Sequence, residues 1–131
     1  MTNLTFITGA TSGIGLETAR LFAKQKRPLV INGRRLDRLN DLQKELSSQT
    51  EVIVAPFDVS DKDEVVNWFQ KNAAICSRVG ALINNAGLAR GSDPIHKADE
   101  KDWEEMIDIN VKGLLSVTHR LIPALLANKG H

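Results

Sequence analysis

A glycine-rich segment near the start of the chain constrains the fold more than any other feature. Gly9, Gly13 and Gly15 follow a short apolar run at residues 4–7, and a helical pattern extends from about residue 13 to about residue 26. A glycine-rich turn between a strand and a helix lets the backbone approach a phosphate closely, and the helix N-terminus offers unpaired N–H groups. The segment therefore predicts a dinucleotide site at the start of a βαβ unit. The residues expected to bind the cofactor here are Gly9, Ala10, Thr11, Ser12, Gly13, Ile14 and Gly15.

Strand and helix patterns alternate four times along the chain, with short connections. Strands are expected at residues 4–7, 29–31, 52–55 and 81–83, and helices at about 13–26, 36–46, 61–73 and 99–127. The strands are near-continuous apolar runs, which is typical of parallel strands that are buried on both faces. Right-handed crossovers then place helices on both faces of the sheet. We therefore expect an α/β fold of the Rossmann type, with a doubly wound parallel sheet.

Local patterns add detail to the helices. The first helix is expected to pack on the sheet through Ile14, Thr18, Leu21 and Phe22, and the third helix through Val65, Val66, Phe69 and Ala73. Ser60 is expected to cap the third helix, with Asp63 in the position of a capping box. The last helix is expected to bend near Pro123. Residues 88–98 contain glycine, proline and mixed polar residues, which predicts a loop.

Composition excludes several classes of function. The 131 residues suffice for one domain, and 17 basic and 16 acidic side chains give a net charge of +1. This balance leaves no basic surface for nucleic acid or an anionic membrane. The single cysteine, Cys76, cannot form an internal disulfide and is expected to be a half-buried filler at a helix end. No signal peptide or membrane span is expected, nor a metal site, and the interpretation is a cytoplasmic protein.

The end of the second strand indicates which dinucleotide is bound. An NAD site usually carries an acidic residue there, which bonds the ribose 2′-hydroxyl. Here the sequence is Asn32-Gly33-Arg34-Arg35, with no acid before Asp37. A guanidinium can bind a 2′-phosphate through two charge-assisted hydrogen bonds, whereas a carboxylate would repel it. Arg34 and Arg35 therefore predict NADP(H).

Four sequence blocks, in register with these elements, resemble the short-chain dehydrogenase/reductase family. They are Thr8 to Gly15, Asp58-Val59, Asn84 to Gly87 and Asn110 within Ile107 to Val111. The resemblance implies hydride transfer between nicotinamide and a hydroxyl- or carbonyl-bearing carbon, with the chain forming the first four of the family's seven strands. A narrower resemblance, in residues 84–89 and 102–108, is to the NADP-dependent serine and 3-hydroxy acid dehydrogenases.

The resemblance also assigns roles to individual residues. Asp58 would contact adenine by its side chain and Val59 by its backbone, while Asn85, with Ala86 and Gly87, would contact the cofactor and Asn84 would brace the sheet. Asn110 would serve catalysis by holding a water in a proton relay. Considered without the resemblance, Asp58 could be a plain turn residue, and the two asparagines of residues 84–85 an Asx-type turn. Asn110 falls within an apolar stripe, where an amide needs hydrogen-bond partners. The alternative to a catalytic role is therefore a structural amide that is bonded to backbone.

That apolar stripe is wider than one packed face requires. Its members are Met106, Ile107, Val111, Leu114, Leu115, Val117, Leu121, Ile122, Leu125 and Leu126. The surplus must be buried on a further part of the sheet or on another subunit. The stripe alone does not separate these two explanations, but members of the family that the chain resembles often pair through this helix, so the resemblance implies a homodimer or homotetramer through residues 102–127.

Tyrosine, the general acid/base of the family, is absent from the 131 residues. Residues 1–131 therefore correspond to an NADP-binding Rossmann domain truncated before the family's catalytic Ser/Tyr/Lys segment, and the chain alone is expected to be inactive. The leading hypothesis is an NADP(H)-dependent oxidoreductase acting on a small-molecule substrate. The alternative is a non-catalytic nucleotide-binding or dimerising protein with a half-Rossmann fold.

Overall fold

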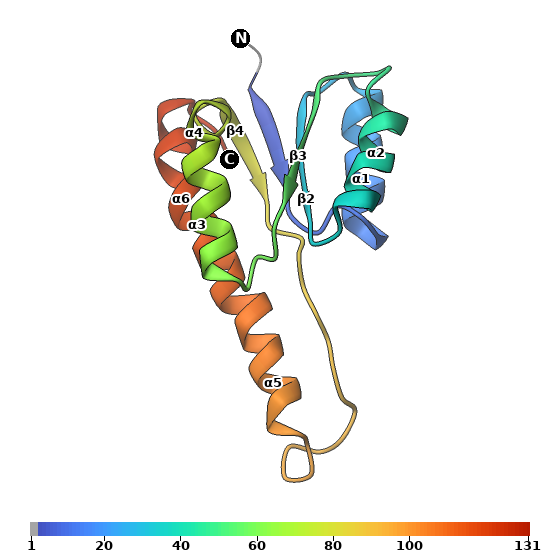
Figure 1. Ribbon diagram of the computed structural model, residues 1–131, viewed down its shortest axis with the longest axis vertical. Coiled ribbons are helices and arrows are strands. Elements are labelled where there is room, and N and C mark those ends of the chain that lie inside the picture. The colour runs from blue at the N-terminus through green and yellow to red at the C-terminus, as the bar shows by residue number, and fades with distance from the viewer. Residues whose placement is uncertain (1–2) are drawn as a thin grey trace.

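The computed structural model describes residues 3–131, which form a four-stranded parallel sheet with helices on both faces (Figure 1). The strands are β1 (Leu4–Ile7), β2 (Leu29–Gly33), β3 (Val52–Pro56) and β4 (Val79–Ile83), in the order β3-β2-β1-β4. Every neighbouring pair is parallel. The predicted doubly wound sheet is confirmed, and the point where the strand order reverses lies beside β1. Ligands bind at such a point in open α/β sheets, outside the carboxyl ends of the strands.

Two helical layers cover the sheet. Helices α1 (Gly13–Lys24) and α2 (Leu36–Leu46) lie on one face, and α3 (Lys62–Lys71), α4 (Ala73–Cys76) and α6 (Leu114–Ala127) on the other (Figure 1). Because successive strand residues point to opposite faces, Phe6 joins the core under α3 and α6, and Ile7 joins the core under α1 and α2. Phe6, Phe57, Trp68 and Phe69 form an aromatic cluster in the first of these cores, with ring centroids 5.3–6.4 Å apart.

Helix α1 packs through its smallest residues. Gly15, Ala19 and Ala23, spaced four apart, are its buried positions. The predicted face was wrong for Ile14 and Leu21, which are 80% and 54% exposed, whereas Phe22 is half-buried and packs against the core as expected. Small side chains allow a helix to approach a sheet closely, and in α1 the larger Leu16 and Phe22 pack half-buried beside this contact.

Helix α3 begins one residue later than predicted. Its N-cap is Asp61, whose carboxylate accepts hydrogen bonds from the N–H groups of Asp63 and Glu64. Ser60 is therefore not the cap. The buried face is Val65 and Phe69, with Val66 half-buried; α3 ends at Lys71, and the exposed Ala73 starts the short helix α4.

An arm projects from the sheet, made of the extended segment 84–99 and α5 (Glu100–Ile107) (Figure 1). A π-helical turn, η1 (Asp108–Gly113), connects α5 to α6. Gly113 is buried against Val59, and a Cβ there would come within 2.7 Å of a Val59 methyl group. Helix α6 runs through Pro123, where a bend stays a prediction, and a separate irregularity, η1, precedes the helix.

The apolar stripe of α5–α6 is only partly covered in the structure. Val117, Leu121 and Leu125 are buried under α6. Six other members are 40–74% exposed, namely Ile107, Val111, Leu114, Leu115, Ile122 and Leu126. Among residues 3–131, no helix has the length and apolar character needed to cross a membrane.

Candidate cofactor site

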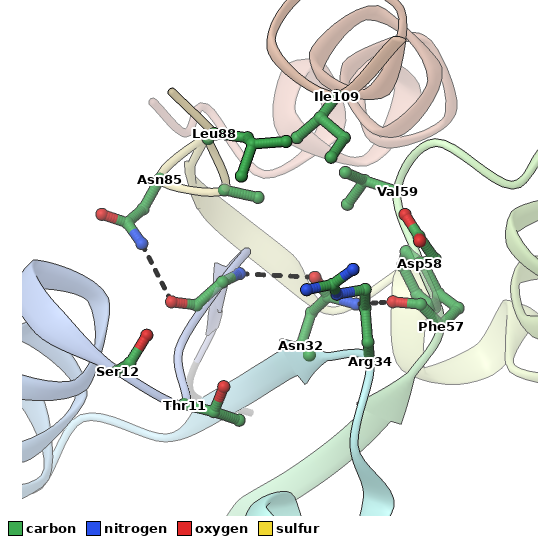
Figure 2. A pocket seen from close by; sticks show the side chains of 14 residues that line it. Thr11, Ser12, Asn32, Arg34, Phe57, Asp58, Val59, Asn85, Leu88 and Ile109 are labelled. Carbon is green, nitrogen blue, oxygen red and sulfur yellow. Dashed lines mark hydrogen bonds between the residues drawn. The ribbon is translucent and has the colours of Figure 1, made fainter. Parts of the chain in front are cut away.

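A cleft of about 290 Å³ lies at the carboxyl ends of the four strands. Nine of the residues predicted to bind the cofactor line it: Gly9, Thr11, Ser12, Arg34, Asp58, Val59, Asn85, Ala86 and Gly87. Five further residues also line it: Asn32, Gly33, Phe57, Leu88 and Ile109. Figure 2 shows Asn85 on one side of this cleft, Arg34 and Asp58 on the opposite side, and Asn32 between them.

The other predicted cofactor residues lie around the cleft rather than on its lining. Ala10 is fully buried beneath the glycine turn, and its N–H donates to the Asn32 backbone carbonyl at 2.8 Å. Gly13, Ile14 and Gly15 form the first turn of α1. Arg35 is exposed and is the N-cap residue of α2.

The glycine turn needs its glycines at specific points. Gly9 has a φ of +64°, and a Cβ there would come within 2.9 Å of the Ala86 Cα. A Cβ on Gly15 would collide with the carbonyl oxygen of Gly9 and the side-chain amide of Asn85. The absence of a side chain at Gly15 therefore makes room for the turn and for Asn85.

Hydrogen bonds from β4 hold the turn in place. The Thr8 hydroxyl accepts from the N–H groups of Asn85 and Ala86, both at 3.0 Å. The Asn85 side-chain amide donates to the carbonyls of Thr8 and Gly9 at 3.1 and 3.0 Å. Asn84, expected to brace the sheet, instead donates to the Thr118 hydroxyl of α6 at 2.9 Å. The bracing contacts to the turn thus come from Asn85, and Thr8 is a contributor that sequence reasoning did not single out.

Asn32 is a second residue that sequence reasoning missed. It is 1% exposed, and its Nδ2 donates to the carbonyls of Ala55 and Phe57 at 2.9 Å each. Its Oδ1 accepts the Gly9 N–H at 3.4 Å. One sequence signal was available: Asn32 is a lone amide directly after the apolar run 29–31 of a buried strand.

The rim of the cleft beyond β3 carries Asp58. Its Oδ1 accepts from the N–H and the hydroxyl of Ser60 at 2.9 and 2.7 Å, and its own N–H donates to Glu64 at 2.8 Å. These bonds hold a carboxylate on the cleft wall. Asp58 is thus a turn residue, as the alternative predicted, and its side chain can still contact a ligand in the cleft.

The opposite rim is tied to η1 by Asn110. Its Oδ1 accepts the Leu88 N–H at 2.7 Å, and its Nδ2 donates to the Leu88 carbonyl at 2.8 Å. Although it falls within the apolar stripe, Asn110 is exposed. The alternative of an amide bonded to backbone is what the structure contains, and its neighbour Ile109 reaches the cleft lining.

The start of α1 suits an anion. Ser12 is the N-cap residue, its hydroxyl makes no capping hydrogen bond, and the first turn contains no acidic residue. The N–H groups of this turn and the positive end of the helix dipole therefore remain for a phosphate, with the hydroxyls of Thr11 and Ser12 beside them. Together with the positive φ of Gly9, these features fit the pyrophosphate of a dinucleotide.

The sequence matches the family model of short chain dehydrogenases over residues 3–131. It is 43% identical over 126 residues to sulfoacetaldehyde reductase 2 of Chromohalobacter salexigens, covering 96% of this chain and 50% of the relative. It is 40% identical to serine 3-dehydrogenase of Agrobacterium fabrum over 130 residues, covering 99% of this chain and 51% of the relative. An NADP-dependent 3-hydroxy acid dehydrogenase of Escherichia coli K12 is 37% identical over 129 residues, covering 98% of this chain and 51% of the relative. The chain thus spans about half the length of these relatives, and the resemblance to this family and to its serine and 3-hydroxy acid members is confirmed.

Solved structures agree with the fold. An alcohol dehydrogenase from the archaeon Thermococcus sibiricus, complexed with 5-hydroxy-NADP, superposes with a TM-score of 0.92 at 28% sequence identity. The match covers 99% of this chain and 56% of the archaeal one.

Proposed function

The chain belongs to the short-chain dehydrogenase family, and we propose that it is the NADP(H)-binding part of an oxidoreductase. The observation that carries this proposal is the cleft at the carboxyl ends of the strands. It combines an anion-binding helix start, a glycine in the left-handed region and an arginine on one wall. A relative that is NADP-dependent by name supports the choice of cofactor.

The end of β2 favours NADP(H) over NAD(H). Arg34 lines the cleft, where its guanidinium can bind the 2′-phosphate. Gly33 leaves no room for an acidic side chain, because a Cβ there would lie 2.8 Å from a Thr11 methyl group. The Asp58 carboxylate, held by Ser60, would accept a hydrogen bond from the adenine amino group, with Val59 contacting the ring by its backbone.

The remaining residues would position the nicotinamide end. Bound NADP(H) supplies the hydride or accepts it. Asn85, Ala86 and Gly87 lie where the cofactor ribose would pass, and Asn110 fixes the backbone of Leu88 beside them. The sequence contains no tyrosine, so we propose that the acid/base step needs a segment outside these 131 residues and that Asn110 serves the proton relay.

The substrate we propose is a small hydroxy or oxo compound, such as a 3-hydroxy acid or a serine-like compound. The names of the relatives, which include a sulfoacetaldehyde reductase and a serine 3-dehydrogenase, support this class. A homodimer or homotetramer through residues 102–127 is supported by the exposed apolar side chains of α6. A stripe of this size would face water unless another subunit or a further part of the sheet covered it.

The test compares the affinities for NADPH and NADH in arginine variants. Arg34→Ala should weaken NADPH binding by about tenfold to hundredfold, because charge-assisted bonds to the 2′-phosphate are lost, and should leave NADH binding unchanged. Arg35→Ala should have a smaller effect, since Arg35 lies outside the cleft lining. Arg38→Ala, also exposed in α2, is the matched control. An unchanged NADPH/NADH ratio in both Arg34→Ala and Arg35→Ala would refute the choice of NADP(H).

The alternative, a non-catalytic nucleotide-binding or dimerising protein, is favoured by the absence of tyrosine together with the uncovered stripe on α6. The coding sequence past codon 131 separates the two functions. A serine followed some dozen residues later by Tyr-x-x-x-Lys supports the enzyme. A stop codon at that point supports the alternative.

A further inference from the structure

The side chain of Asn32 joins three segments that come from different parts of the chain. It lies on β2, between β1 and β3, and is 1% exposed at the base of the cleft. Both Nδ2 hydrogens are used, by the carbonyls of Ala55 and Phe57. These two bonds, each 2.9 Å, fix the plane of the amide, so that Oδ1 faces the Gly9 N–H.

Gly9 is thereby held from both sides. Asn32 accepts from its N–H, and the Asn85 amide donates to its carbonyl at 3.0 Å. The φ of +64° at Gly9 is therefore fixed by side chains from β2 and from the end of β4, on either side of β1. At the other end of the Asn32 network, Phe57 immediately precedes Asp58 on the cleft rim.

We propose that Asn32 is a positioning residue that couples the phosphate-facing glycine turn to the adenine-facing rim at Phe57–Asp58. The proposal rests on the proposed function, because it assumes that one dinucleotide spans both places. Its physical basis is preorganisation: two binding elements that are already held at the right separation need not be ordered when the ligand binds. Figure 2 shows Asn32 between the two walls, with a dashed line to Phe57.

The test uses two ligands of different length. On the proposed function, NADPH binds the rim with its adenine and the N–H groups of the turn with its pyrophosphate, whereas adenosine 2′-monophosphate lacks the pyrophosphate and cannot use those N–H groups. Asn32→Ala should raise the Kd of NADPH by about tenfold, and the Kd of adenosine 2′-monophosphate by less than about threefold. Both constants are measured by titration on the full 131-residue chain.

Asn128→Ala is the matched control. Asn128 also donates two hydrogen bonds of 2.9 Å from Nδ2 to backbone carbonyls, those of Ser77 and Val79, but it does so near the start of β4, at the end of the strand opposite the cleft. This variant should lose stability without changing either Kd. If Asn32→Ala does not fold, Asn32→Thr takes its place, because the threonine hydroxyl can donate to one of the two carbonyls. Asn32→Thr should raise the Kd of NADPH by less than Asn32→Ala does. It should still weaken NADPH more than adenosine 2′-monophosphate.

A second readout needs no ligand. Amide hydrogen exchange at Gly9 should accelerate in the Asn32 variants and stay unchanged in Asn128→Ala. Three results would each overturn the coupling. One is an equal rise in the Kd of both ligands in Asn32→Ala, and another is a loss of NADPH affinity in Asn128→Ala as large as that in Asn32→Ala. The third is unchanged exchange at Gly9 in the Asn32 variants. Failure of the unsubstituted protein to bind NADPH would instead refute the proposed function, and the exchange at Gly9 would still decide the role of Asn32.

Discussion

Replacing Thr8 by valine removes one oxygen atom from the centre of the site and changes the shape of the side chain little. The Thr8 side chain is 2% exposed, and its hydroxyl is the acceptor for the N–H groups of Asn85 and Ala86. Each backbone N–H that loses its partner in a buried site costs about 1–3 kcal/mol. Because Asn85 and Ala86 are half-buried, water can reach part of this region, and the cost for each N–H should lie near the lower limit. For the two groups together, the free energy of unfolding should fall by about 2 kcal/mol. That is a large fraction of the about 5–15 kcal/mol by which a domain is stable.

The assay is urea denaturation followed by far-UV circular dichroism, with the free energy of unfolding taken from the midpoint and slope. Thr8→Ser is the control, because it keeps the acceptor and loses one methyl group, worth about 1 kcal/mol. NADPH affinity should fall in Thr8→Val and persist in Thr8→Ser, since Asn85 and Ala86 line the cleft. If Thr8→Val is as stable as Thr8→Ser, the Thr8 hydroxyl does not hold the turn to β4 and the reasoning fails.

Three further predictions concern other parts of the molecule. Gly15→Ala should abolish measurable NADPH binding in calorimetry, because its Cβ would collide with Gly9 and Asn85; Gly13→Ala, which has open space around it and a φ of +56°, should cost only about 1–2 kcal/mol of stability. Asn110→Ala should lower the free energy of unfolding by about 1–2 kcal/mol through loss of its two bonds to Leu88, and an unchanged thermal midpoint would contradict this. Burial raises the pKa of the Cys76 thiol from 9.0 to about 11, so its alkylation rate by iodoacetamide should keep rising to about pH 11. Because the unfolded thiol loses its proton first, stability should fall between pH 9 and 11, and Cys76→Ala should flatten that decline.

Apolar strands and long apolar helix faces could be predicted from the sequence because each is a local pattern. The four strands begin and end within two residues of the expected positions, and Leu39, Leu42 and Leu46 are the buried face of α2. Helix α1 could not be oriented in this way. Its buried residues, Gly15, Ala19 and Ala23, are small and carry little hydrophobic signal, and of the predicted large apolar residues only Phe22 packs against the core.

Other errors came from choices that local sequence leaves open. Ser60 and Asp61 are adjacent residues that can both cap a helix, and only the geometry of the chain entering α3 selects Asp61. The π-helical turn at Asp108–Gly113 was not predicted, because no residue type marks such a turn in the sequence.

The candidate site was predictable to the extent that its residues form compact motifs. The glycine turn, Arg34, Asp58 and the block at residues 85–87 all reach the cleft lining. Thr8 has partners 77 and 78 residues away and Asn32 has partners 23 to 25 residues away, so the local sequence marks Asn32 as an unusual amide but does not identify the partners of either residue. Arg34 and Arg35 look equivalent in the sequence, but only Arg34 lines the cleft, because Arg35 already begins the turn into α2.

The chain has two tryptophans in different surroundings, one in the core and one in the projecting arm. Trp68 belongs to the aromatic cluster under α3, whereas Trp103 lies on α5, which contacts the adjoining turn η1 and the loop segment of the same arm. Segments with few contacts to the body open at a lower free energy than the core. Intrinsic fluorescence should therefore change in two steps during denaturation, the first from Trp103. In Trp103→Phe only the later step should remain, and it should coincide with the loss of circular dichroism.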